Sequence, residues 1–97
     1  MNTTAKDIIE KLESLYYLLR DEGFSSRSDE IKNLIYALEK NDDKVFKENY
    51  SSRNIWGGSG SVLDIDFRNS EKNKIRDDAL KALKEYRNKV YKPFWRF

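Results

Sequence analysis

Apolar residues recur at helical spacing in three separate stretches of the chain. Ile8, Leu12, Leu15 and Leu19 are spaced four, three and four residues apart, which places them on one face of a helix. Residues 25–41 and 70–91 carry the same kind of pattern. At 97 residues, the chain is long enough for one modest core. The pattern therefore predicts an all-α fold, a single helical domain spanning 1–97.

Turn-forming residues divide this domain into four expected helices, at about 4–22, 25–41, 42–50 and 70–91. Thr4 is a suitable N-cap for the first helix. Gly23 ends it, because glycine takes a left-handed conformation cheaply, and Phe24 is then expected to lie near Leu19. Pro93 ends the last helix, since proline cannot continue the hydrogen-bond ladder.

The segment between the third and last helices has a different character. Residues 54–61 hold three of the four glycines. After them, Leu63, Ile65 and Phe67 alternate with two aspartates, which is a strand-like pattern. We expect an irregular glycine-rich segment with one short strand, either alone or paired with 54–56 as a hairpin.

Catalytic chemistry has little support in the composition. The chain has no Cys and no His, so it lacks thiolate ligands and the usual neutral-pH proton shuttle. Ser59 stands in a glycine-rich stretch, but the fifth position of the nucleophile motif is Ser61 rather than glycine. Asp64 and Asp66 form either a metal or acid–base pair or a solvated strand face, and we favour the solvated face. We expect a non-enzyme with no cofactor and no metal.

Charge is divided unevenly along the chain. Residues 1–71 carry a net charge of −4, and residues 72–97 carry +6. The basic end offers an alternative function, a small nucleic-acid-binding accessory protein. In that reading lysines and arginines contact phosphates and aromatic rings stack on bases. Its residues would be Lys81, Lys84, Arg87, Lys89, Lys92, Tyr86, Tyr91 and Trp95, although Tyr86 shares the apolar helix face and is expected in the core.

The two chain ends carry further expectations. The N-terminal residues lack the apolar stretch of a signal peptide, and no run approaches the ~18 apolar residues of a membrane span. We therefore expect a cytoplasmic protein that does not enter a membrane. The aromatic tail Phe94-Trp95-Arg96-Phe97 either folds back onto the core or forms a homodimer contact.

The stretch Trp56-Gly57-Gly58-Ser59-Gly60-Ser61-Val62-Leu63-Asp64 follows two or three short helices. In this setting, it resembles the Trp-Gly-Gly-x-Gly-Ser-x-x-Asp loop of a family of small bacterial proteins. Some members of that family are similar to immunity proteins of polymorphic toxin and contact-dependent growth inhibition systems. The resemblance covers the central loop, and the preceding helices more loosely.

This resemblance implies a toxin inhibitor. Such a protein binds one cognate toxin domain, commonly a nuclease, in a one-to-one complex and covers its active site or substrate groove. Nuclease toxins tend to be basic, so the acidic first part of the chain is the expected contact surface. Tyrosine and tryptophan often anchor such interfaces. The candidate partner-binding residues are therefore Glu10, Glu13, Tyr17, Asp21, Glu22, Asp29, Glu30, Asp42, Asp43 and Trp56.

Overall fold

The structure, a computed structural model, describes residues 5–57 and 60–90. Most of these residues are helical, and none of them lies in a strand. The prediction of an all-α domain is thus confirmed, as is the prediction of four helices longer than two turns, to which the structure adds two short helical segments.

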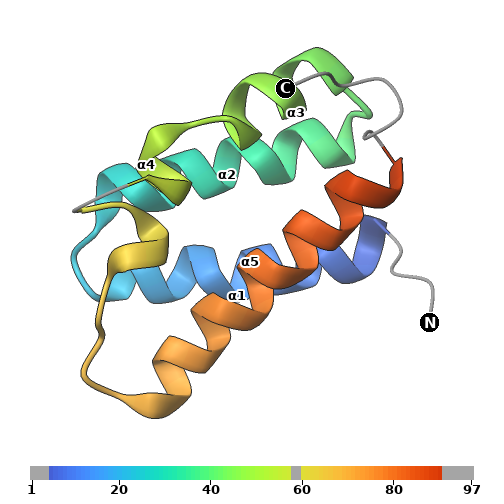
Figure 1. The fold of residues 1–97 in the computed structure, drawn as a ribbon. Helices are drawn as coiled ribbons and strands as arrows, with labels where there is room; N and C mark the ends of the chain where they lie inside the picture. The colour runs from blue at the N-terminus through green and yellow to red at the C-terminus, as the bar shows by residue number, and fades with distance from the viewer. Residues whose placement is uncertain (1–4, 58–59, 91–97) are drawn as a thin grey trace.

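The first two helices are an antiparallel pair, α1 (Ala5–Asp21) and α2 (Ser25–Glu39), joined by a tight turn (Figure 1). Gly23 lies in this turn with a φ of +87°. This conformation lets the N–H of Phe24 donate to the carbonyl oxygen of Leu19 at 2.8 Å. The predicted glycine stop is confirmed, because this bond is the long-range bond of a Schellman motif.

A second left-handed residue separates α2 from α3 (Asp43–Tyr50). Asn41 has a φ of +54°, and the next N–H, that of Asp42, donates to Ala37 O at 2.9 Å. The Asp42 side chain then accepts a hydrogen bond from the N–H of Val45 at 3.1 Å. Asp42 is therefore the N-cap of α3, and its negative charge is stabilised by the positive end of the helix dipole.

The expected strand at 63–67 is wrong. The chain instead forms a short helix, α4 (Arg53–Trp56), and after the glycines a 3₁₀ turn, η1 (Val62–Asp64). The three apolar residues do not share one buried face, because Leu63 is exposed while Ile65 is buried and Phe67 is half-buried. A hairpin with 54–56 is likewise wrong, because those residues are helical.

The last helix, α5 (Ser70–Val90), supplies the bonds that hold η1 in place. Arg76 is almost fully buried in α5, and its Nη1 donates to the carbonyl oxygens of Val62, at 3.0 Å, and Ile65. Its Nε donates to the Asp77 carboxylate, which balances the charge. These bonds satisfy two backbone acceptors beside η1.

The apolar face of α5 is partly as expected. Ala79 and Leu83 are buried, and Tyr86 is half-buried against the core. Ile75 is a correction, because its side chain remains 39% exposed while Arg76, one position later, is buried in the interior. The expected contribution of Val90 lies outside the side chains that the structure describes.

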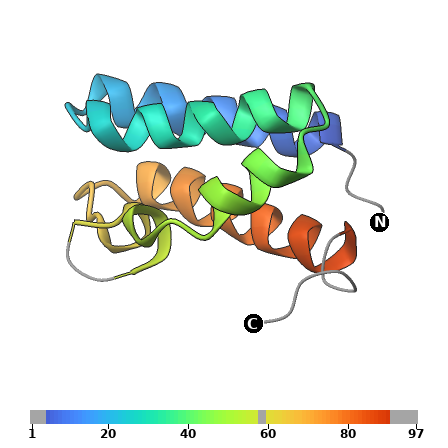
Figure 2. The same cartoon turned by 90° about the horizontal axis from the view of Figure 1, so that it is seen from above.

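The helices form two layers. α1 packs against both α2 and α5, and α2 packs against α3. Figure 2 shows α1 and α2 in one layer, α5 with α4 and η1 in the other, and α3 reaching between them. The core lies between these layers, and its largest fully buried side chains include Phe46, Ile8, Leu12, Leu15 and Leu34.

Some expectations fall outside the described residues, namely the Thr4 cap, the loop residues 58–59 and the aromatic tail at 94–97. Within the described ranges, the structure contains no helix both long enough and apolar enough to cross a bilayer.

Candidate functional site

Tyrosine side chains gather on the outer surface of the α1–α2 pair. Tyr17 is 52% exposed and Tyr36 is 49% exposed, so both rings present a large part of their surface to solvent. Tyr16 lies half-buried beside them, with its ring centroid 5.1 Å from that of Tyr17 in an edge-to-face arrangement. We call Tyr16, Tyr17 and Tyr36 the tyrosine patch.

Two cations hold the rings of the tyrosine patch. The Lys32 ammonium lies 4.8 Å from the ring centroid of Tyr16 and 5.5 Å from that of Tyr36. The Arg20 guanidinium lies 5.4 Å from the ring centroid of Tyr17. Cation–π contacts of this kind contribute about 0.5–1 kcal/mol at exposed sites, which favours these ring orientations modestly.

Carboxylates flank this patch. Glu13 on α1 and Glu39 on α2 line the same shallow depression as the tyrosines, about 160 Å³ in volume, with Ile35 as an apolar lining residue. Lys32 lines the same depression and Arg20 contacts Tyr17, so the surface is mixed in charge. Its exposed rings and Ile35 offer apolar contact to a protein partner, and Glu13 and Glu39 can pair with basic side chains of that partner.

The structure brings some of the ten candidate residues together at this surface. Glu13 and Tyr17 lie one turn apart on α1 and line the same depression. Glu10 and Asp21 are exposed one turn to either side of them on the same helix. Asp29 is exposed in the first turns of α2 and does not line the depression.

Other candidates have structural partners instead. The Glu22 carboxylate pairs with the Lys72 ammonium of α5 at 3.3 Å. Glu30 Oε1 accepts hydrogen bonds from Ser52 Oγ at 2.9 Å and from Asn54 Nδ2 at 3.1 Å. Glu22 thus links α1 to α5, and Glu30 links α2 to the start of α4.

The remaining candidates lie away from the patch. Asp42 caps α3, and Asp43 is exposed in the first turn of the same helix. Trp56 is half-buried, and its indole N–H donates to the carbonyl oxygen of Tyr50 at 2.6 Å. Trp56 also packs against the core, so its first role is to hold α4 against the end of α3.

Sequence reasoning missed Tyr16, Tyr36, Lys32 and Glu39. A signal for Tyr36 was present, because the apolar face of α2 is fixed by Ile31, Leu34 and Leu38, and position 36 falls off that face. A tyrosine on the polar side of an amphipathic helix is not needed for the core. Two of the cation–π contacts had a signal as well, because Arg20 and Tyr17 lie three residues apart on α1 and Lys32 and Tyr36 lie four residues apart on α2. The contact of Lys32 with Tyr16 had none, since it joins two different helices.

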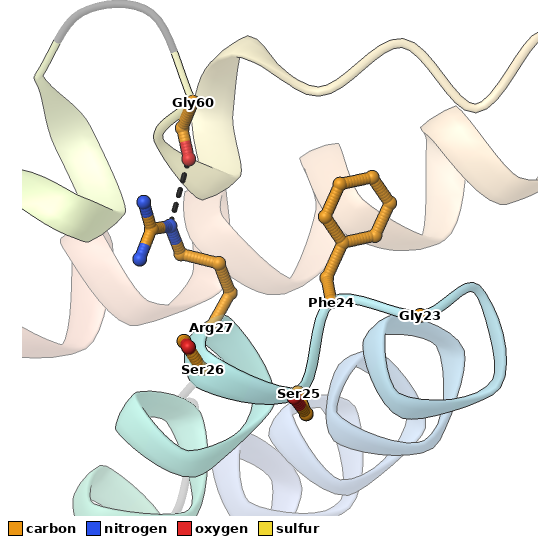
Figure 3. A pocket seen from close by; sticks show the side chains of 6 residues that line it. All are labelled: Gly23, Phe24, Ser25, Ser26, Arg27 and Gly60. Carbon is orange, nitrogen blue, oxygen red and sulfur yellow. Dashed lines mark hydrogen bonds between the residues drawn. The ribbon is translucent and has the colours of Figure 1, made fainter.

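A second depression, about 330 Å³, lies where the α1–α2 turn meets the glycine loop (Figure 3). Arg27 extends from the first turn of α2, and its Nε donates to the carbonyl oxygen of Gly60 at 2.7 Å. Gly60 has a φ of +86°, a conformation that favours glycine. This contact fixes the end of the loop that follows residues 58–59.

The Asp64–Asp66 pair is exposed to solvent, and Asp66 has a structural role. Its Oδ1 accepts hydrogen bonds from the N–H of Arg68 at 2.8 Å and from Asn73 Nδ2 at 3.2 Å. The backbone bond from Arg68 is the main cause that holds the pKa of Asp66 below its ordinary value, and the bond from Asn73 adds to it. Across residues 5–57 and 60–90, no cluster of acidic side chains is arranged to hold a metal ion.

The nucleic-acid alternative needs aromatic rings on α5 that are free to stack on bases, and Tyr86 does not provide one. That ring is half-buried and meets Phe46 edge to face, with centroids 6.1 Å apart. The Arg87 guanidinium lies 5.5 Å from the ring centroid of Tyr50. Burial raises the pKa of the Tyr50 hydroxyl from its ordinary value, and the positive charge of Arg87 partly opposes this rise. Lys81, Lys84 and Lys89 are exposed.

No protein-family model matches this chain, and comparisons with curated proteins and with solved structures give no match.

Proposed function

We propose that this protein binds a basic protein partner through the tyrosine patch, and that the partner is a toxin domain which it neutralises. The observation that carries the binding role is the pair of half-exposed rings, Tyr17 and Tyr36, flanked by Glu13 and Glu39. The resemblance of the 56–64 loop to proteins similar to immunity proteins supplies the class of partner.

The energetics of the patch favour recognition. Tyrosine offers a large contact area and a hydroxyl while losing little conformational freedom, which is why it is frequent among the residues that dominate interface affinity. Here Arg20 and Lys32 already restrain the rings, so association costs less side-chain entropy. The patch lies on exposed helix surface, so its rings are available without rearrangement of the core.

The acids around the patch contribute mainly to the rate of capture. Glu13 and Glu39 line the depression, and Glu10 and Asp21 extend the acidic surface along α1. Carboxylates in this arrangement attract a basic nuclease surface and orient it before contact. Inhibition then follows by occlusion, because a helical domain seated on the substrate groove excludes a nucleic-acid strand.

The first test is genetic and biochemical. The gene should directly follow one that encodes a protein ending in a toxin domain, and the two products should copurify one-to-one. Co-expression should protect cells from that toxin. Absence of an adjacent toxin gene together with failure to protect would sink the toxin assignment.

The second test locates the surface. Tyr17→Ala combined with Tyr36→Ala should abolish protection and weaken toxin binding at least about a hundredfold, because two anchors are removed. A matched control is Tyr50→Phe, which alters a half-buried tyrosine elsewhere and should leave binding unchanged. If the double variant keeps its affinity for the toxin, the tyrosine patch is not the binding surface. Toxin binding itself is then decided by the genetic and copurification test.

A further inference from the structure

A second surface, on the other layer of the fold, has features of a binding groove. It is a hollow of about 360 Å³ where α4 and η1 meet α5, and most of its lining is apolar. We call it the α4–α5 groove, and its lining residues are Trp56, Leu63, Asp77, Leu80, Lys81 and Lys84.

Leu63 gives the groove an exposed apolar wall. The side chains on either side of the turn, Val62 and Ile65, are buried, whereas Leu63 is 46% exposed. Arg76 fixes this turn from beneath by donating to the carbonyl oxygens of Val62 and Ile65. Leu63 is thus held in an outward orientation, which keeps a large apolar side chain available to a partner.

The charge at the rim of the groove is positive. The Asp77 carboxylate accepts a hydrogen bond from Arg76 Nε and is already balanced. Lys81 and Lys84 are exposed on α5, and neither makes a hydrogen bond or an ion pair with another residue in the described part of the chain. An occupant with carboxylates beside an apolar side chain would complement this arrangement.

We propose that the α4–α5 groove binds a short acidic protein segment, which places a bulky apolar side chain against the exposed Leu63, above the buried Leu80, and carboxylates near Lys81 and Lys84. A protein segment fits better than nucleic acid. Trp56 is the one aromatic residue in the groove lining, and it is half-buried with its N–H committed to Tyr50, so the lining offers no open stacking platform for bases. This surface is separate from the tyrosine patch and independent of the toxin proposal.

The test begins with a displayed library of random short peptides. Peptides are selected on the wild-type chain and counter-selected on the variant carrying Leu63→Ser, Lys81→Glu and Lys84→Glu. Enriched sequences should combine Asp or Glu with Leu, Ile or Phe. Enrichment of sequences no more acidic than the starting library, or no enrichment at all, overturns the proposal.

Affinity is then read from the protein's own fluorescence. The chain has two tryptophans, so Trp95→Phe leaves Trp56 as a single reporter in the groove. A synthetic enriched peptide should change Trp56 emission. Its affinity should fall about tenfold with Lys81→Glu and Lys84→Glu together, and should fall as salt is raised. The matched control, Lys74→Glu with Lys89→Glu, changes the same charge at exposed α5 positions outside the groove lining and should retain binding.

Three outcomes assign the groove to a different occupant and overturn the proposal. Peptide binding that appears only after deletion of 93–97 assigns it to the chain's own C-terminal residues. A wild-type dimer that sediments as a monomer after Leu63→Ser assigns it to a second copy. Displacement of the peptide by a single-stranded oligonucleotide at low concentration assigns it to nucleic acid.

Discussion

Arg76 of α5 donates a hydrogen bond from Nη1 to the carbonyl oxygen of Val62 at 3.0 Å, across fourteen residues of sequence. The same nitrogen also donates to Ile65 O, and Arg76 as a whole is 7% exposed. One buried side chain therefore ties the irregular segment of the fold to its longest helix.

Loss of this tie should be costly. Arg76→Leu removes the side-chain donor to Ile65 O and leaves Val62 O with only the 3.4 Å bond from the N–H of Ile65, so we expect the free energy of unfolding to fall by about 2–4 kcal/mol. Urea denaturation monitored by circular dichroism measures the change. The control Lys74→Ala removes an exposed cation from the same helix and should change stability by less than about 0.5 kcal/mol. Equal stability of the two variants would contradict the role given to Arg76.

The two glycines that flank structured turns should respond differently to alanine. Gly23 has a φ of +87°, so Gly23→Ala forces an L-residue into the left-handed region although space for a Cβ is open, and we expect a loss of about 1 kcal/mol. Gly57 has a φ of −113°, and an added Cβ would make only ordinary contacts with Arg53. Gly57→Ala should be neutral or slightly stabilising. Thermal denaturation of both variants checks the contrast.

Acid should weaken the turn that precedes α5. Hydrogen bonds from the N–H of Arg68 and from Asn73 hold the pKa of Asp66 below its ordinary value. Its contribution to stability is therefore complete above the unfolded-state pKa of about 3.9 and is lost as pH falls through the lower folded-state pKa. Carboxyl carbon shifts, followed by NMR against pH, should place the Asp66 midpoint below that of an unfolded aspartate. Asp66→Asn should make the melting temperature less dependent on pH below about pH 4. An unchanged slope of melting temperature against pH in this variant would contradict the stabilising role of the Asp66 carboxylate.

Kinetic measurements should separate the roles of acids and tyrosines at the patch. Glu13→Lys with Glu39→Lys should slow association with the toxin and reduce its salt dependence, because steering acts on the encounter. Tyr17→Ala should instead speed dissociation, since it removes a packed anchor. Surface plasmon resonance at two salt concentrations resolves both rates. The control Glu71→Lys with Glu85→Lys makes the same charge change at two exposed positions of α5, and should affect association less.

The helical framework could be predicted because α1 and α2 each bury a continuous apolar face and α5 buries most of one. Leu12 and Leu15 of α1 and Leu34 of α2 lie at positions that periodicity alone assigns to the core. The strand expected at 63–67 failed for a physical reason. A strand needs backbone donors from a neighbour, and here the Arg76 guanidinium supplies donors to Val62 O and Ile65 O in its place. Periodicity on one segment cannot reveal a donor from a distant helix.

The candidate site was predictable only in part. Tyr17 and Glu13 follow from helix position and residue type, and both line the tyrosine patch. Glu30 looks equally available in the sequence, yet its carboxylate accepts hydrogen bonds from Ser52 and Asn54, more than twenty residues away. Acidic side chains on a helix surface and acidic side chains in tertiary hydrogen bonds have the same local sequence, so only the fold separates them.

Three tethers of the irregular segment share one chemical form. Arg27, Trp56 and Arg76 each donate from a side chain to a backbone carbonyl, on Gly60, Tyr50, and Val62 with Ile65. Every amino acid carries that acceptor, so these bonds place no demand on which side chain stands at the accepting position. In homologous chains the donors should therefore be retained while the acceptor positions drift, subject only to packing and backbone conformation. Alignments anchored on the arginines and the tryptophan, rather than on the glycine run, should recover distant relatives more reliably.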